Sequence, residues 1–344
     1  MHAALVTARH TVELIEFDEP TPADTGVVVD IAYCGICGTD VHSFESTAPV
    51  NPATCGHEWV GTVSAAGRSV DSVAEGDRVV IAVPPACGSC EPCRAGHTRW
   101  CTTTFLHLVG RDPLAPPHGG FAPAIAVGEG RVMRANAELS DEQAAQVEPA
   151  TICFHGVRSS HVRPGDTTVV QGAGPIGLLT LQFARVAGAG HTIVIEPNPD
   201  RRALAAAVGA SAVVEPGEAA TQAVADATRG LGADIVFECA GLPHVIQTAS
   251  DFARRGGALA LIGFTTESAR IQPATWMIKE LSVTASLGYT HDEFERCMGL
   301  IADGRIDVDS LHTDTIGLDD VGAALADLAS GGTTRTKVLV DPRQ

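Results

Sequence analysis

The sequence predicts a mixed α/β protein with a β-rich first domain and a second domain that contains a doubly wound parallel sheet. In the first third of the chain, short apolar runs alternate with turns rich in Gly and Pro, which is typical of β-structure. From Thr167 onward, strand-like and helix-like segments alternate. Strands that are separated by helices imply parallel pairing, with helices on both faces of the sheet. The 344 residues are sufficient for about two domains.

Short apolar runs mark the strands of the first domain. A run that alternates polar and apolar side chains predicts a half-buried strand, and a run that is nearly all apolar predicts a buried one. We assign residues 1–150 and 305–344 to this domain. The expected strands are Val12–Phe17, Val27–Tyr33, Val60–Val63, Arg78–Val83 and, near the C-terminus, Lys337–Val340.

The second domain, residues 151–304, shows the alternation of strands and helices most clearly. The segment DEQAAQVEPA, which begins at Asp141, opens the helical part of the chain. Helices are expected, for example, over Ile176–Val186, Arg201–Val208 and Glu293–Asp303. The expected strands are Thr168–Gln171, Thr192–Glu196, Ala212–Val214, Asp234–Glu238, Leu259–Gly263 and Ser282–Leu287.

Composition and charge exclude several functions. The formal net charge is -18, with 41 acidic and 23 basic residues, and such a surface repels the phosphate backbone of nucleic acids. No apolar run approaches the roughly 18 residues of a membrane span, and the N-terminus lacks the order of a signal peptide. In a chain without a signal-peptide pattern, ten cysteines indicate free thiols and metal ligands rather than disulfides. We therefore expect a cytoplasmic protein with neither a nucleic-acid nor a membrane partner.

The segment CGSCEPCRAGHTRWC carries four cysteines at short spacing. Thiolates this close together are able to surround one tetrahedral zinc ion, at about 2.3 Å from each sulfur. Four thiolates leave no open coordination position, so the pattern predicts a structural zinc site. A pair of disulfides or scattered core cysteines is the alternative. The four ligands would be Cys87, Cys90, Cys93 and Cys101.

A glycine-rich loop follows the predicted strand Thr168–Gln171 and leads into an apolar helix. Gly172, Gly174 and Gly177 form the pattern GxGxxG. The first glycine permits a tight turn, the second lets the backbone approach a pyrophosphate, and the third allows close packing of helix and strand. The N-terminus of the helix then faces the anion. Ordinary turn glycines are the alternative.

An acidic residue stands where a dinucleotide-binding domain needs one. Glu196 closes the next strand, 19 residues after Gly177. A carboxylate at this place accepts hydrogen bonds from the ribose hydroxyls of NAD and repels the additional phosphate of NADP. Arg201 and Arg202 lie nearby and weaken that preference. A solvated strand end is the alternative for Glu196, but the loop and the acid together predict NAD binding.

A second group of candidate metal ligands leaves one coordination position open. Cys34 and Cys37 form a CxxC pair, and His57 follows twenty residues after Cys37. Glu148 precedes the second domain. A thiolate, an imidazole and a carboxylate make a three-ligand zinc set that leaves one position for a substrate. As alternatives, Cys34 and Cys37 would be a redox pair or core residues. Glu58, which directly follows His57, would have a supporting or charge role.

With these motifs, the chain resembles the zinc-dependent medium-chain alcohol dehydrogenases over nearly its whole length. The resemblance is carried by CGICGTDVH, GHEWVGTV, the four-cysteine lobe, GGF, VEPA and GAGPIG, in that order. It implies a GroES-like catalytic domain with a zinc lobe at residues 87–101, and a Rossmann-type cofactor domain. VEPA with His155, seven residues after Glu148, is similar to the branch of sorbitol, butanediol and threonine dehydrogenases.

The resemblance implies a catalytic zinc bound by Cys37, His57 and Glu148. Glu58 matches a family residue that approaches the zinc or binds it directly, and we include it among the expected metal ligands. Asp40 resembles the carboxylate that orients the ligand histidine. One departure from the family is GGFAPAI at residues 119–125, where many relatives carry an acid and an aromatic residue after GGFA.

The resemblance also implies a reaction and a route for its proton. Zinc polarises the hydroxyl of an alcohol, and a hydride passes to the nicotinamide ring. Thr39 would receive the hydroxyl proton, and His42 would release it to solvent. The expected cofactor contacts are Gly172, Gly174, Pro175, Ile176, Gly177, Glu196, Arg201, Ala240, Gly263, Ser286 and Leu287.

We therefore expect an NAD-dependent zinc dehydrogenase that acts on a secondary alcohol or polyol, or on its ketone. It would hold two zinc ions per chain and form a homodimer or homotetramer, for which an exposed strand at Ser282–Leu287 is suitable. One alternative is an NADPH-dependent reductase of carbonyls or double bonds, but such relatives usually lack the cysteine lobe. The other is a non-enzymatic zinc-ribbon protein, which predicts a basic face that this acidic chain does not have.

Overall fold

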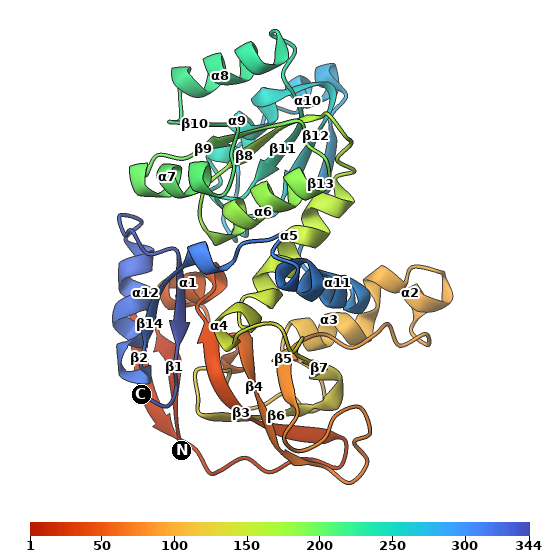
Figure 1. Ribbon diagram of the computed structural model, residues 1–344, viewed down its shortest axis with the longest axis vertical. Helices are drawn as coiled ribbons and strands as arrows, with labels where there is room; N and C mark the ends of the chain where they lie inside the picture. The colour runs from red at the N-terminus through yellow and green to blue at the C-terminus, as the bar shows by residue number, and fades with distance from the viewer. The chain divides into compact units, whose positions relative to one another are not determined.

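The computed structural model describes all 344 residues and divides into two compact units. Unit 1 contains Met1–Glu148, Tyr289–Asp303 and His312–Gln344, and unit 2 contains Pro149–Gly288 and Gly304–Leu311. The predicted α/β fold class is confirmed, because unit 1 is rich in antiparallel strands and unit 2 contains a parallel sheet (Figure 1). None of the helices has the length and the apolar character that crossing a membrane requires.

The units differ from the predicted domain boundaries at the C-terminal side. The sequence analysis placed residues 289–303 in the second domain, whereas the structure places them in unit 1. The reason lies in their partners: the ring Nδ1 of His291 donates a hydrogen bond to the carbonyl of Val83 at 2.9 Å. Residues 304–311 belong to unit 2 instead, where Gln182 and Asp307 exchange hydrogen bonds of 2.9 and 2.7 Å.

Unit 2 contains a six-stranded parallel sheet with the order β10-β9-β8-β11-β12-β13. The chain starts in the middle of the sheet at β8, builds toward one edge, and then returns to build toward the other. The order therefore reverses between β8 and β11, and ligands of such sheets bind beside that reversal, at the carboxyl ends of the strands. The strands are β8 (Thr167–Gln171), β9 (His191–Ile195), β10 (Ala212–Val214), β11 (Ala233–Glu238), β12 (Ala253–Leu261) and β13 (Ser282–Ala285).

Helices cover both faces of this sheet, as Figure 1 shows for α6 and α9. Proline at the first position begins α6 and α7, and the side chain of Asn198 caps α7 by accepting hydrogen bonds from two backbone N–H groups. Apolar side chains of the strands pack with those of α8 and α9 in a core cluster around Val169, Ile193 and Val236. The helices are α5 (Val147–Ser159), which begins at the end of unit 1, α6 (Pro175–Val186), α7 (Pro199–Ala207), α8 (Glu218–Thr228), α9 (Val245–Phe252) and α10 (Pro273–Lys279).

Unit 1 is built on a seven-stranded sheet with the main order β14-β15-β3-β4-β5-β7, in which β6 also pairs with β3; β1 and β2 form a separate antiparallel pair. Strand β15, near the C-terminus, pairs with the end of β3 through Leu339 and Val340. This pairing carries the start of β15 to the segment that follows β3. The strands are β1 (His2–Ala8), β2 (Thr11–Glu16), β3 (Gly26–Gly35), β4 (Glu58–Ala66), β5 (Arg78–Ile81), β6 (Ala124–Gly128), β7 (Val132–Arg134), β14 (His312–Ile316) and β15 (Lys337–Val340).

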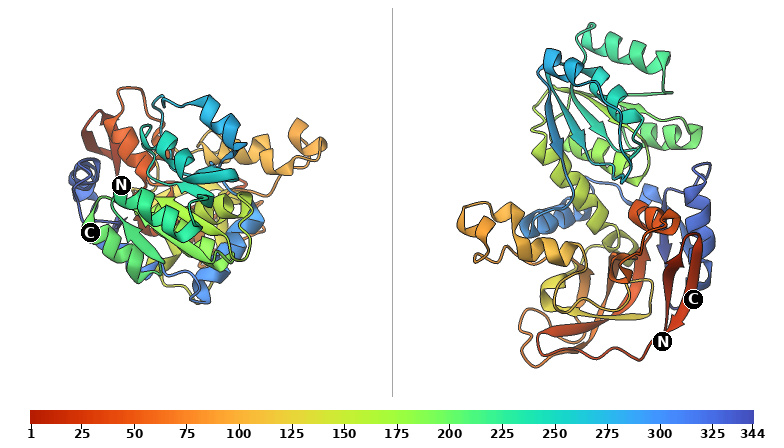
Figure 2. Two further views of the ribbon diagram at one scale, coloured as in Figure 1. Left: turned by 90° about the horizontal axis from the view of Figure 1, so that it is seen from above. Right: turned by 180° about the vertical axis from the view of Figure 1, so that it is seen from behind.

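The helices of unit 1 are mostly short, and Figure 2 shows them from two further directions. The longest of them, α11, begins with a capping box in which Thr290 and Glu293 satisfy each other's backbone N–H groups. The helices are α1 (Gly38–Glu45), α2 (Glu91–Arg94), α3 (Thr102–Leu108), α4 (Asp141–Ala144), α11 (His291–Ala302) and α12 (Val321–Ala329). Single 3-10 turns occur at Pro52–Thr54, Thr98–Trp100, Glu129–Arg131 and Leu318–Asp320, and in unit 2 at Asp309–Leu311.

Candidate active site

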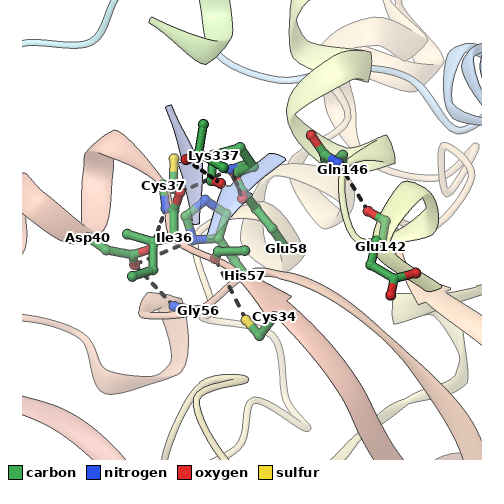
Figure 3. A network of polar contacts seen from close by, with 12 residues as sticks. Cys34, Ile36, Cys37, Asp40, Gly56, His57, Glu58, Glu142, Gln146 and Lys337 are labelled. Atoms are coloured by element: carbon green, nitrogen blue, oxygen red, sulfur yellow. Dashed lines mark hydrogen bonds and ion pairs between the residues drawn. The ribbon is translucent and has the colours of Figure 1, made fainter. Parts of the chain in front are cut away.

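Unit 1 brings together a thiol, an imidazole and a carboxylate from two separate segments of the chain. Cys37 precedes α1 as its N-cap, His57 lies in the loop before β4, and Glu58 is the first residue of β4. One ligand atom from each of the three lies within 4.8 Å of the others (Figure 3). Strands β3 and β4 are antiparallel neighbours, so the end of β3 and the start of β4 meet at one edge. The set offers one sulfur, one nitrogen and one oxygen donor, which suits zinc.

The orientation of His57 is fixed by a backbone carbonyl. Its Nδ1 lies 2.7 Å from the carbonyl oxygen of Thr54, which only accepts, so Nδ1 carries the proton. Nε2 then has a free lone pair, as a metal ligand needs. Asp40, expected to orient this ring, lies 3.9 Å from Nδ1 and instead accepts backbone hydrogen bonds from Cys37 at 2.8 Å and Gly56 at 3.0 Å. Its main effect is to hold the two ligand loops together.

Glu58 is fully buried and forms an ion pair with Lys337. Lys337 is the first residue of β15, and its ammonium group also donates to the carbonyl of Ile36 at 3.0 Å (Figure 3). Both side chains are at most 2% exposed. The sequence analysis did not identify Lys337 as a site residue. Two features of the sequence could have indicated it: the chain has only two lysines, and this one begins the apolar run KVLV.

Glu148 lies on α5, close to this group but outside the set of three. Burial raises the pKa of its carboxyl to about 7, although neighbouring His57 lowers it. The hydroxyl of Tyr289 forms a hydrogen bond with the Glu148 side chain, and the buried guanidinium of Arg131 acts on the same carboxylate. The structure therefore provides two carboxylates, Glu58 and Glu148, for one metal position. The sequence analysis missed both Tyr289 and Arg131.

The charges of the site favour a divalent cation. The thiolate of Cys37 and the carboxylates of Glu58 and Glu148 carry three negative charges when ionised, and Lys337 carries one positive charge. Their sum of -2 is cancelled by one divalent ion. Burial lowers the pKa of His57, but nearby acidic groups, Cys37 first among them, raise it well above its ordinary value. A positive charge is therefore favoured where the imidazole stands, and the donor set fits zinc.

The two candidate proton carriers, Thr39 and His42, lie on α1 directly after Cys37. Oγ1 of Thr39 is buried and has no hydrogen-bond partner within the protein. A buried hydroxyl without a partner is costly unless a ligand completes it. His42 lies one helical turn further on and is partly exposed. This arrangement is compatible with transfer of a proton away from a substrate beside Thr39.

The four-cysteine lobe forms a second candidate metal centre. One sulfur from each of Cys87, Cys90, Cys93 and Cys101 lies within 4.8 Å of the others. Backbone N–H groups donate to two of these sulfurs at 3.3 Å: that of Cys90 to Cys87, and that of Cys87 to Cys101. Hydrogen bonds, that from Ser89 first, lower the pKa of the Cys87 thiol to about 5, which favours the thiolate. All ten cysteines are free, so the alternative of paired disulfides does not hold in this structure.

In unit 2, the glycine-rich loop has the geometry that binding a pyrophosphate requires. Gly172 has a φ of 92°, in the region that favours glycine. A Cβ atom on Gly177 would lie 1.9 Å from the carbonyl oxygen of Gly172, so only glycine permits the helix to approach the turn. Gly174 is the N-cap of α6, and a Cβ atom there would meet no atom within 4 Å. The loop therefore leaves room in front of the helix N-terminus, where Pro175 and Ile176 begin α6.

Glu196 follows β9 and is oriented by the glycine-rich loop itself. Its carboxylate oxygens accept hydrogen bonds from the backbone N–H groups of Ala173 at 2.7 Å and Asn198 at 2.8 Å. Each oxygen retains a second lone pair for a ribose hydroxyl. Arg202 donates to the carbonyls of Glu196 and Pro197 at 2.9 and 2.6 Å. Arg201 is partly buried on α7.

The remaining predicted cofactor contacts follow other strands of the same parallel sheet. Ala240 follows β11, Gly263 follows β12, and Ser286 and Leu287 follow β13. Because carboxyl ends of parallel strands meet at one edge of a sheet, these residues share the edge with the glycine-rich loop. The buried carboxylate of Glu238, at the end of β11, was missed: it accepts hydrogen bonds from Ala240 and Gly241 at 2.8 and 2.9 Å. The feature of the sequence that could have indicated Glu238 is an acidic residue at the end of an apolar strand.

Comparison with known proteins identifies the family. The alcohol dehydrogenase GroES-like domain matches residues 23–137, and the zinc-binding dehydrogenase model matches residues 175–303. The (R,R)-butanediol dehydrogenase of Bacillus subtilis is 31% identical over 99% of this chain and 100% of its own length. The chain therefore belongs to the zinc-dependent medium-chain alcohol dehydrogenases, which confirms the predicted family and the predicted class of oxidoreductase.

Two solved structures show that relatives bind nicotinamide dinucleotides of both kinds. A proposed zinc-binding dehydrogenase of Sinorhizobium meliloti 1021, bound to NADP, is similar with a TM-score of 0.84 and 31% identity, over 99% of both chains. An alcohol dehydrogenase of Escherichia coli CFT073, complexed with NADH, is similar with a TM-score of 0.85 and 26% identity, over 99% of both chains.

Proposed function

We propose that this protein is an NAD-dependent zinc dehydrogenase that oxidises secondary alcohols or polyols, or reduces the corresponding ketones. The observation that carries the proposal is the set of Cys37, His57 and Glu58, with the unpartnered hydroxyl of Thr39 close by in the sequence. A metal bound at this set supplies a Lewis acid that lowers the pKa of a substrate hydroxyl. In the same proposal, the cluster Cys87, Cys90, Cys93 and Cys101 holds a second, structural zinc ion.

The reaction is a two-electron oxidation in which the alcohol loses one hydride and one proton. The C–H bond of the carbinol carbon would break with loss of a hydride, and a bound NAD would supply the acceptor for that hydride. The hydroxyl proton leaves through Thr39 and then His42, and the carbon–oxygen bond becomes a carbonyl. The products are a ketone, NADH and one proton. Glu148, Asp40 and the loop carbonyl of Thr54 keep the donor set in position.

The preference for NAD rests on the surroundings of Glu196. Its carboxylate is held by two backbone N–H groups at the end of β9, where it suits two ribose hydroxyls and repels a phosphate. Arg202, one candidate partner for a phosphate, donates to two backbone carbonyls and forms an ion pair with Glu215 at 2.8 Å. This arginine is therefore already engaged in a way that favours NAD over NADP. The contacts of Arg201, Ala240, Gly263, Ser286 and Leu287 with the cofactor belong to the same proposal.

A panel of alcohols and ketones tests the proposal directly. The panel contains the stereoisomers of 2,3-butanediol, sorbitol, xylitol, 2-propanol and ethanol, with NAD and NADP in parallel, and absorbance of the reduced nicotinamide is followed. We expect oxidation of a diol or polyol with NAD, and little oxidation of ethanol. Reduction of carbonyls or double bonds with NADPH alone, without alcohol oxidation, would favour the reductase instead.

The role of the metal set is tested by single substitutions with a matched control. Cys37→Ala and His57→Ala should abolish turnover while the circular dichroism spectrum stays that of the wild type. Cys297→Ala serves as the control, because Cys297 is another buried thiol of unit 1 that lies on α11. Retention of full activity in Cys37→Ala would rule out the proposed site.

We also propose that the chain assembles as a homodimer or homotetramer in the cytoplasm. Strand β13 is an edge strand of the parallel sheet, and it exposes Val283 by 40%. Met277 and Ile278 on the neighbouring α10 are exposed by 77% and 74%. Exposed apolar groups beside an unpaired edge support pairing with a second copy. Sedimentation should give at least a dimer, and Val283→Lys should give a monomer; a monomeric wild type would contradict this. The ten free thiols support a cytoplasmic location, because cysteines stay reduced there.

A further inference from the structure

Lys337 is a buried charge that the proposed reaction does not use. It is 2% exposed, and two of its donors are accounted for by Glu58 and by the carbonyl of Ile36. Both partners are hydrogen-bond acceptors, a carboxylate and a backbone carbonyl, which suits an ammonium group. A permanent positive charge in this place repels the metal ion that the donor set attracts. Its presence therefore needs an explanation other than metal affinity.

The local backbone is adapted to this ion pair. A Cβ atom on Gly35 would collide with the Glu58 carboxylate and would lie 3.3 Å from the ammonium nitrogen of Lys337. Gly35 ends β3 and pairs directly with Glu58 on β4 and with Leu339 on β15. Three strands thus meet at a residue without a side chain, and the space so formed is filled by the ion pair. The arrangement fixes where the Glu58 carboxylate lies.

The ion pair divides the Glu58 carboxylate between two cations. Lys337 holds Oε2, so only Oε1 is available to a metal ion at Cys37 and His57. Bidentate binding, or a full approach of the carboxylate to the ion, requires the Lys337 contact to break. A ligand that is held in this way binds weakly and leaves readily.

We propose that Lys337 is a positioning residue that keeps Glu58 partly withdrawn, so that the metal ion retains an open position for the substrate oxygen. Two carboxylates, Glu58 and Glu148, lie near one metal position, and if both bound fully with Cys37 and His57 the tetrahedral shell would be closed. The lysine prevents this closure. The inference rests on the proposed function only in placing a divalent ion at Cys37 and His57.

The test uses zinc affinity and the spectrum of the cobalt-substituted protein, both measured without substrate. In Lys337→Met, Glu58 is released to the metal, so we expect zinc to bind about tenfold more tightly, a gain equal in size to the smallest loss that removing a supporting partner of a metal ligand usually causes. The visible bands of Co²⁺ should shift, and kcat should fall although the protein is fully loaded with metal. Lys337→Arg, which keeps the charge, should restore the wild-type spectrum.

A double variant keeps the test decisive if Lys337→Met does not fold. Glu58→Gln with Lys337→Met removes both charges together, and replacing both members of a buried pair is usually tolerated. We expect this double variant to bind zinc within about tenfold of the wild type, because Glu58 contributes little as a ligand. Loss of zinc as complete as in Cys37→Ala would overturn the inference, as would a Lys337→Met variant with unchanged or weaker zinc binding. A wild type that takes up no second zinc would instead refute the proposed function.

Discussion

A single carbonyl oxygen, that of Thr54, decides which nitrogen of His57 faces the metal site. Because the carbonyl only accepts, Nδ1 must donate at 2.7 Å, and Nε2 is left available as the candidate ligand atom. The sequence analysis identified the histidine but assigned its orientation to Asp40. Contacts between a side chain and a loop carbonyl leave no pattern in the sequence. The candidate residues were therefore predictable from the sequence, whereas the orientation of the histidine ring was not.

Thr39 offers the most direct residue-scale test of the proton route. Its hydroxyl is buried without a partner, so it is free to accept the substrate proton. Thr39→Val keeps the shape and removes the hydroxyl, and we expect kcat to fall about a hundredfold or more with zinc content unchanged. Thr39→Ser should retain most of the activity. Wild-type kcat in the valine variant would eliminate this route.

His118 makes stability depend on pH, independently of the metal. It is 2% exposed, and burial lowers the pKa of its ring. In the unfolded chain a histidine has a pKa of about 6.5. The contribution of neutral His118 is therefore fully present above that value and is lost as the pH falls through the lowered folded value.

The expected result is a smaller free energy of unfolding at pH 5.5 than at pH 7.5, measured with urea and circular dichroism. His118→Gln should show a smaller loss over the same interval, because it cannot take up a proton. Identical losses in both proteins would show that other groups cause the effect.

At the scale of elements, the glycine-rich loop permits a matched pair of substitutions. A Cβ atom at position 177 would collide with the carbonyl of Gly172, so Gly177→Ala should lower the free energy of unfolding by about 1–3 kcal/mol. A Cβ atom at position 174 meets no protein atom, so Gly174→Ala should fold normally. It should nevertheless bind NAD about tenfold more weakly or worse, because the methyl group occupies the place of the pyrophosphate. Calorimetry measures both quantities, and normal NAD binding by Gly174→Ala would contradict the assignment.

We expect the four-cysteine lobe to depend on a bound zinc ion, because it has little other structure to hold its shape. Its helix α2 has four residues, and Trp100 beside it is 64% exposed. Cys101→Ser should reduce the zinc content from about two ions per chain to about one, and should make residues 87–101 sensitive to proteases. Metal analysis and limited proteolysis measure this. Two retained zinc ions per chain would contradict the prediction.

Elements with a clear periodicity were predictable, and elements fixed by tertiary contacts were not. All six predicted strands of the parallel sheet are present, with β10 at the expected residues and the others shifted by a few. The segment around Glu148 was correctly predicted as helical. Helix α1 was not among the helices predicted from the sequence, because a helix of eight residues with one buried apolar side chain, Phe44, has no visible period. The ammonium group of Lys337 donates to the carbonyl of Ile36, which lies 301 residues earlier in the chain. No local sequence pattern reveals such a contact.

At the scale of the whole molecule, the proposed function assigns the metal chemistry to one unit and cofactor binding to the other. Unit 1 holds the donor set and the cysteine lobe, and unit 2 holds the glycine-rich loop and Glu196. The motifs predicted this division because each one is local in the sequence. The exact membership of residues 289–311 was not predictable, because hydrogen bonds of His291 and Asp307 to distant partners determine it.

The proposed function depends most on a metal ion at Cys37 and His57 that hydride transfer to NAD requires. The direct measurement follows zinc content and NADH formation in the same samples while a chelator removes the metal in steps. We predict about two zinc ions per chain at the start, loss of NADH formation together with the first ion removed, and recovery when zinc is returned. Undiminished NADH formation by protein stripped of both ions would contradict the account.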